Sequence, residues 1–96
     1  MTQQTICHGD ITEACGIIAA NREAYTINRP LPTTPARRRQ RLLAEGRDAL
    51  ASALMNKFGL KNYSTLTAAI RRGFGPTPDW ESINQAGAVA LGIWEN

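Results

Sequence analysis

The residues best suited to metal binding or nucleophilic chemistry gather near the N-terminus. Cys7 and His8 are adjacent, and Asp10, Glu13 and Cys15 follow closely. Zinc prefers these side-chain types, and a Cys–His nucleophile pair uses two of them. The spacing argues against both uses, because the chain has one histidine and no two cysteines separated by two residues. We therefore expect Cys15 to be a small core residue, and Cys7 and His8 to lie in an exposed segment that precedes the first helix.

No other group of residues predicts catalysis. Gly73 and Gly75 follow a predicted helix rather than a strand, which is the wrong context for a phosphate-cradling glycine loop. Asp79 and Glu81 are explained by the first turn of a helix, where negative charge is favourable. We expect no enzymatic activity, no cofactor and no bound metal.

A cluster of arginines lies at the predicted start of the longest helix and comprises Arg37, Arg38, Arg39 and Arg41. Positive charge is unfavourable there, because the helix dipole is positive at its N-terminus. An anionic partner would relieve this cost, and the planar guanidinium suits phosphate because it can donate two hydrogen bonds. Three interpretations remain open: a solvated charged face, a nucleic-acid contact, or a contact with an acidic protein surface.

Positive charge is concentrated in the middle of the chain. Residues 37–72 hold nine basic and two acidic side chains, a net charge of +7. The rest of the chain holds two basic and six acidic side chains, a net charge of −4. This asymmetry predicts a polarised surface, which favours an anionic partner.

The segment 51–73 resembles the helix-turn-helix motif of DNA-binding proteins. A helix rich in small residues reaches Gly59, the apolar Leu60 follows, and a short polar helix carries Leu66 and Ile70 internally. In that family the second helix enters the major groove with its N-terminal residues at the base edges. The resemblance implies that base contacts come from this helix, chiefly from Ser64, Thr65 and Thr67. It further implies that the cations nearby would meet phosphates, namely Lys57, Lys61, Arg71 and Arg72.

These features predict a small regulatory protein that binds nucleic acid, with duplex DNA the favoured partner. The alternative is a protein-binding inhibitor or adaptor, of the kind that mobile elements encode against a host machine, docking its arginine-rich face on an acidic protein. An RNA-binding protein ranks third, because the sequence shows no exposed aromatic platform for stacking unpaired bases. A homodimer is compatible with each of these.

Helix start and stop signals predict about four helices. Asp10 with Glu13 forms a capping-box pattern for a helix over about 11–25. Pro30 and Pro32 then require a non-helical connector. Two further predictions follow, of a helix from a Thr34 cap to Phe58 and of a shorter one from Asn62 or Ser64 to about Arg72.

The fourth predicted helix begins with Thr77 as its cap and Pro78 at its first position. Trp80 and Trp94 are fourteen residues apart, so this helix would place them on one face. The run 86–92 is small and apolar, which predicts burial against other helices. Gly46 leaves open whether the long second helix is kinked or broken.

Composition and length predict one all-α domain over residues 1–96, a compact bundle or orthogonal array of helices. The chain has 96 residues, of which 43% are apolar and 20% charged, as is ordinary for a folded globular protein. No apolar run approaches the roughly 20 residues needed to cross a membrane. The first residues lack the pattern of a secretory signal, and the two cysteines do not form a disulfide framework. We expect a cytoplasmic protein that makes no membrane contact.

Overall fold

The computed structural model describes residues 3–26 and 30–95. Within these residues the chain forms helices and connecting segments, and no strand. The helices are α1 (His8–Ala20), α2 (Arg22–Tyr25), α3 (Pro35–Phe58), α4 (Tyr63–Phe74) and α5 (Trp80–Leu91). The predicted all-α class is confirmed. A fifth helix arises because the first predicted one is divided at Asn21, which ends α1 and precedes the single turn of α2.

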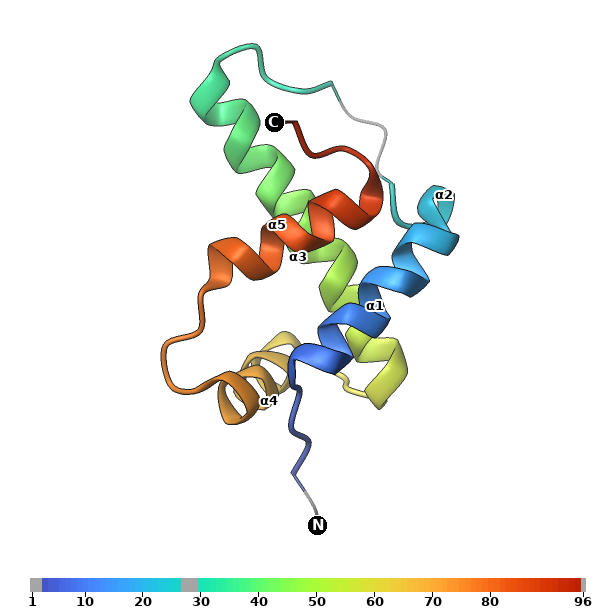
Figure 1. Cartoon of the computed structure of the whole chain (residues 1–96), viewed down its shortest axis with the longest axis vertical. Helices are drawn as coiled ribbons and strands as arrows, with labels where there is room; N and C mark the ends of the chain where they lie inside the picture. Colours follow the sequence, from blue (N-terminus) through green and yellow to red (C-terminus); the bar gives the residue numbers. More distant parts are fainter. Residues whose placement is uncertain (1–2, 27–29, 96) are drawn as a thin grey trace.

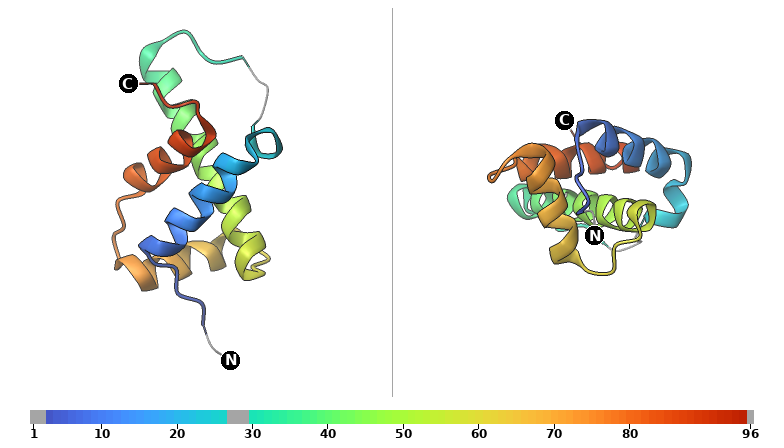
Figure 2. Two further views of the ribbon diagram at one scale, coloured as in Figure 1. Left: turned by 45° about the vertical axis from the view of Figure 1, so that its right-hand side comes forward. Right: turned by 90° about the horizontal axis from the view of Figure 1, so that it is seen from below.

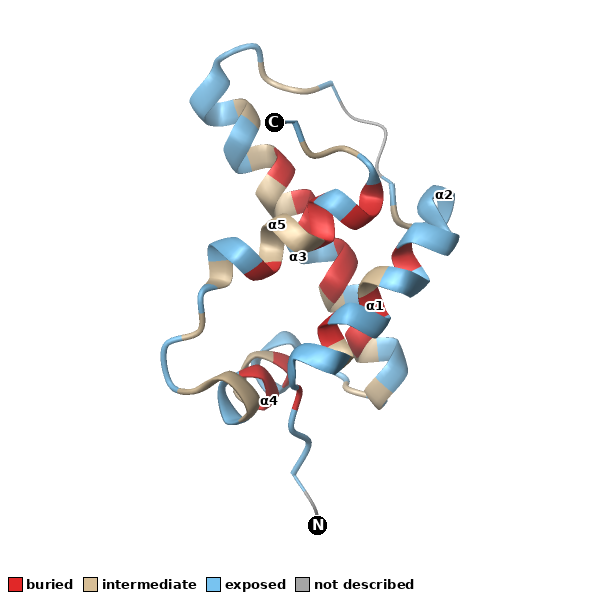
Figure 3. Ribbon diagram, in the orientation of Figure 1, coloured by how far each residue is buried: buried red, intermediate tan, exposed pale blue. Residues whose placement is uncertain are grey.

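The long helix α3 organises the fold. α1 and α5 lie side by side on one face of α3, and α4 runs across the end of α3 (Figures 1 and 2). Buried residues lie where these helices face one another (Figure 3), and Ile18, Leu54 and Leu66 are among the most completely buried. None of the described helices is both long and apolar enough to cross a lipid bilayer.

The predicted boundaries of α3 are confirmed. Thr34 is its N-cap, Pro35 its first residue, and Gly59 ends it in the left-handed conformation with φ 66°. The helix is continuous through Gly46. Glycine at this position lets α5 pack directly against the backbone of α3. A Cβ on Gly46 would lie 2.1 Å from the carbonyl oxygen of Asn84, and one on Gly87 would lie 2.3 Å from that of Gly46. The two backbones therefore touch, and this crossing is the largest contact between helices.

Two predicted helix starts are wrong by two or three residues. α1 begins at His8 with Cys7 as its N-cap, and Asp10 sits one turn inside, where its Oδ2 accepts the Cys7 N–H at 2.9 Å. The predicted capping box is present, but Asp10 rather than Glu13 is its acidic residue, and Cys7 rather than Asp10 is the N-cap. The start of α5 differs similarly, because Asp79 rather than Thr77 is the N-cap and accepts the Ser82 N–H at 3.1 Å.

The sequence predicts Trp80 and Trp94 on one helical face, and this prediction is wrong. α5 ends at Leu91, because Gly92 adopts a left-handed conformation with φ 78°. Trp94 lies in the extended segment that follows and packs against α3, where the guanidinium of Arg39 stands 5.0 Å from its ring centroid. Trp80 remains at the start of α5 and packs against the core.

Candidate nucleic-acid interface

The α3–α4 corner forms where the helix-turn-helix resemblance predicted it. Gly59 reverses the chain, and the Leu60 N–H donates to the Met55 carbonyl at 3.0 Å. Asn62 then caps α4, which runs two residues beyond the predicted end, to Phe74. Leu66 and Ile70 are buried as predicted. The corner places α4 at one end of the molecule (Figure 1), and residues 63–65 and 71–72 of α4 are exposed.

The three hydroxyls predicted to contact bases already donate hydrogen bonds within the protein. The side-chain oxygen of Asn62 accepts from the Ser64 hydroxyl at 2.8 Å and from the Thr65 hydroxyl at 2.6 Å. The Thr67 hydroxyl donates to the Ser64 carbonyl at 3.1 Å. All three hydroxyls therefore have an acceptor within the protein. Ser64 and Thr65 are exposed, so their oxygens are still accessible as acceptors.

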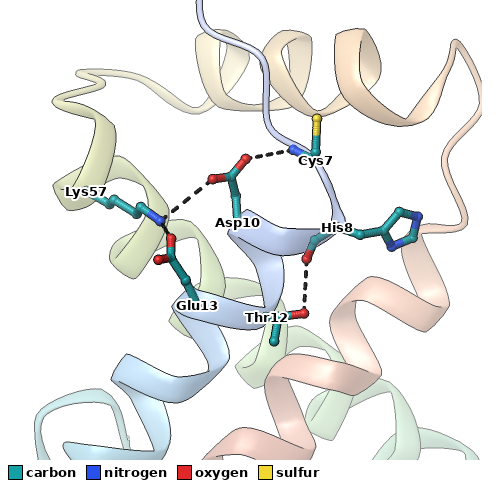
Figure 4. Close-up of polar contacts among 6 residues, drawn as sticks. All are labelled: Cys7, His8, Asp10, Thr12, Glu13 and Lys57. Carbon is teal, nitrogen blue, oxygen red and sulfur yellow. Dashed lines mark hydrogen bonds and ion pairs between the residues drawn. The ribbon is translucent and has the colours of Figure 1, made fainter.

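Three of the predicted phosphate-binding cations are paired with acids inside the molecule. Arg38 pairs with Glu95 at 2.5 Å, and Arg39 pairs with Glu81. Lys57 pairs with two acids of α1, Glu13 and Asp10 (Figure 4). These pairs join α3 to α5, to the C-terminal segment and to α1. They also place an acid beside three of the cations that the sequence had assigned to a partner.

Arg37 and Arg41 lie far from α4. They occupy the first two turns of α3, roughly 25–32 Å along the helix from its end at Phe58, at about 1.5 Å per residue. Arg37 is exposed, whereas Arg41 is half-buried and its Nη1 atom has no hydrogen-bond partner among the described residues. The predicted basic set is therefore divided between two ends of the molecule.

The remaining predicted cations surround α4. Lys61 is exposed in the turn, and Arg71 and Arg72 are exposed in the last turns of α4. Arg72 also donates from Nε to the Gln4 carbonyl at 2.6 Å, which ties the N-terminal segment to α4. That segment is anchored further by Ile6, which is fully buried and donates its N–H to the Ala69 carbonyl at 3.0 Å.

A hollow of about 320 Å³ lies where α3, α4 and α5 meet, and it contains residues that sequence reasoning did not select. Its lining consists of Arg47, Tyr63, Thr67, Arg71, Trp80 and Asn84. The sequence signal for part of it was present, because Tyr63, Thr67 and Arg71 are four residues apart and so share one face of α4. No local pattern could have added Arg47 or Trp80, which come from the neighbouring helices.

The side chains of the N-terminal group of Cys, His and acidic residues do not converge on one point. The imidazole of His8 and the thiol of Cys7 point away from the carboxylate of Asp10 (Figure 4). His8 instead packs on Phe74, with 4.2 Å between the ring centroids. Within residues 3–26 and 30–95, no group of three or more His, Cys, Asp or Glu side chains is placed to hold a metal ion.

The two thiols differ in environment, which predicts different reactivity. Cys7 is exposed, whereas Cys15 is half-buried and its thiol donates to the Ala86 carbonyl at 3.6 Å. Burial raises the pKa of the Cys15 thiol, so less of the reactive thiolate is present at neutral pH. We expect iodoacetamide to alkylate Cys7 on the order of 10-fold faster than Cys15. Mass spectrometry over a time course measures both rates, and equal rates in the folded protein would contradict this placement.

Comparison of the chain with models of protein families, with curated proteins and with solved structures finds no match.

Proposed function

We propose that this protein is a small DNA-binding regulator that contacts duplex DNA with the face around α4. The observation that carries the proposal is the distribution of charge left after internal pairing. Arg38, Arg39 and Lys57 are matched by acids from other parts of the chain. Around α4, by contrast, Lys61, Arg71 and Arg72 have no acidic partner among the described residues.

The shape of this end of the molecule supports the same proposal. α4 has 12 residues, so it is about 18 Å long at 1.5 Å per residue, and it runs across one end of the molecule (Figure 2). The major groove of B-form DNA is about 12 Å wide and admits an α-helix. The cations at the two ends of α4, Lys61 before it and Arg71 and Arg72 in its last turns, would then lie near the phosphates that border the groove.

The hydrogen bonds at the start of α4 favour contact with the DNA backbone over the reading of bases. The Ser64, Thr65 and Thr67 hydroxyls donate within the protein, so they offer a base only an acceptor unless the cap rearranges. The exposed side of α4 has no Asn or Gln, which are the residues that recognise adenine with two hydrogen bonds. We therefore expect modest sequence preference and an affinity that is mainly electrostatic.

Titration of labelled random-sequence duplex DNA by fluorescence anisotropy tests this proposal. With Lys61, Arg71 and Arg72 each on one phosphate, log Kd should change with log salt by a slope of about 2.7. The affinity would then fall roughly 40-fold between 50 and 200 mM salt. Polyglutamate of matched length serves as the control for charge alone. An absence of DNA binding at low salt, or equal binding of polyglutamate, would instead favour an acidic protein partner.

A further inference from the structure

We propose that the hollow where α3, α4 and α5 meet seats one backbone phosphate, held between Arg47 and Arg71. This inference rests on the proposed function and specifies which part of the nucleic acid the hollow receives. Arg47 comes from α3 and Arg71 from α4, and both residues line the same hollow of about 320 Å³. Two guanidiniums around one anion can donate up to four hydrogen bonds to its oxygens, which is the geometry that arginine offers to phosphate.

The chemistry of the lining matches an anion. No carboxylate belongs to it among the described residues. Beside the two arginines, the lining residues include Tyr63, Trp80 and Asn84, whose side chains all carry hydrogen-bond donors. Two of the lining residues have donors engaged elsewhere, since the Thr67 hydroxyl donates to the Ser64 carbonyl and the Arg47 Nε donates to Asp48. A lining so rich in donors and lacking acids stabilises negative charge.

Arg71 is held in place before a partner arrives. Its guanidinium lies 5.7 Å from the ring centroid of Trp80, within the range of a cation–π interaction. Trp80 is itself packed against the core. Because this contact restricts the side chain in advance, less conformational entropy is lost when Arg71 binds an anion.

Arg47 is available to an anion because its own ion pair is weak. Its Nε lies 3.1 Å from the carboxylate of Asp48, its neighbour in the chain, and both side chains are about half exposed. Exposed pairs of this kind contribute little to stability, so a phosphate can displace Asp48. The acid nevertheless competes for Arg47. Asp48→Asn should therefore tighten DNA binding by about two- to fivefold.

A double-mutant cycle on Arg47 and Arg71 tests whether the two share one phosphate. Arg47→Gln and Arg71→Gln should each weaken duplex binding about 10-fold at fixed salt. The double variant should lose much less than the roughly 100-fold product, because either change already disrupts the shared seat. Circular dichroism checks that each variant is folded. Lys61→Gln with Arg71→Gln is the matched control, because Lys61 lies at the other end of α4 and would meet a different phosphate, so these two effects should multiply.

The source of the phosphate is distinguished by NMR titration of the Arg47 and Arg71 side-chain N–H signals. Duplex DNA at micromolar concentration should shift both signals, whereas inorganic phosphate and a mononucleotide should shift them only at millimolar concentration. A mononucleotide that binds more tightly than duplex DNA would overturn the assignment to a backbone phosphate.

The two proposals fail in different ways. If DNA binding is salt-sensitive but the double variant loses the full product of the two single losses in affinity, the shared phosphate is overturned. The DNA-binding proposal would then still stand. An absence of DNA binding by the unaltered protein would overturn both.

Discussion

Gly46→Ala is expected to lower the free energy of unfolding by about 3 kcal/mol or more, the largest effect on stability that we predict for a single methyl group. The added Cβ would lie 2.1 Å from the Asn84 carbonyl oxygen and 2.5 Å from the Ala88 nitrogen. Both are backbone atoms of α5, so no side chain can rotate away to relieve the contact. The helices must move apart, and that loosens the largest helix–helix contact in the fold.

Thermal unfolding followed by circular dichroism measures this effect. For a domain of this size, 3 kcal/mol corresponds to a fall in Tm of roughly 12–24 °C. Gly16→Ala is the matched control, because nothing lies within 4 Å of a Cβ added at this α1 position. The control should gain up to about 1 kcal/mol from the better helix propensity of alanine. If Gly46→Ala were as stable as Gly16→Ala, the crossing of α3 and α5 at Gly46 would be wrong.

Local signals in the sequence predicted much of the helical framework. Thr34, Pro35 and Gly59 set both ends of α3 as expected, because each acts through its own backbone preference. The starts of α1 and α5 were less predictable, since several capping residues lie close together there. Asp10 can cap a helix from outside or accept a backbone N–H from inside the first turn, and only the structure distinguishes these roles.

The crossing of α3 and α5 could not be predicted from local patterns. A glycine inside a helix signals weakness when it is considered alone, and Gly46 was therefore a possible break. Its role depends on Gly87, which lies more than 40 residues later in the chain. Neither glycine has a side chain, so the backbones of α3 and α5 can touch where the two residues meet. The same crossing brings Arg39 to Glu81, so this ion pair could not be predicted from local patterns either.

The candidate site was predicted in part for the same reason. The positions around α4 follow from one helix and its turn, so Lys61, Arg71 and Arg72 were accessible to sequence reasoning. Two arginines at the start of α3, Arg39 and Arg38, differ from them by pairing with acids that lie 42 and 57 residues away in the chain, which no local pattern indicates. Charge composition therefore indicates a polarised chain, while tertiary pairing decides which charges remain at the surface.

The double variant Arg71→Glu/Arg72→Glu is expected to reduce affinity for duplex DNA by about 100-fold or more. Each arginine lost from a phosphate removes a charge-assisted hydrogen bond of about 1.5 kcal/mol, and two such losses amount to roughly 100-fold. The two glutamates add repulsion against the phosphates. The slope of log Kd against log salt should fall by about 1.8, because two phosphate contacts disappear. Anisotropy titration over a series of salt concentrations gives both quantities.

Two further variants separate lost binding from lost folding. Acids in the last turn of α4 oppose the helix dipole by about 0.3–1 kcal/mol each, so a stability measurement must accompany the binding data. Arg71→Gln/Arg72→Gln avoids that cost and should still lose both phosphate contacts. Arg71→Lys/Arg72→Lys keeps the charge and should retain most of the affinity and the salt slope. Undiminished binding by the folded glutamate variant would remove α4 from the interface and leave Arg37 and Arg41, at the far end of α3, as the remaining anion-binding candidates.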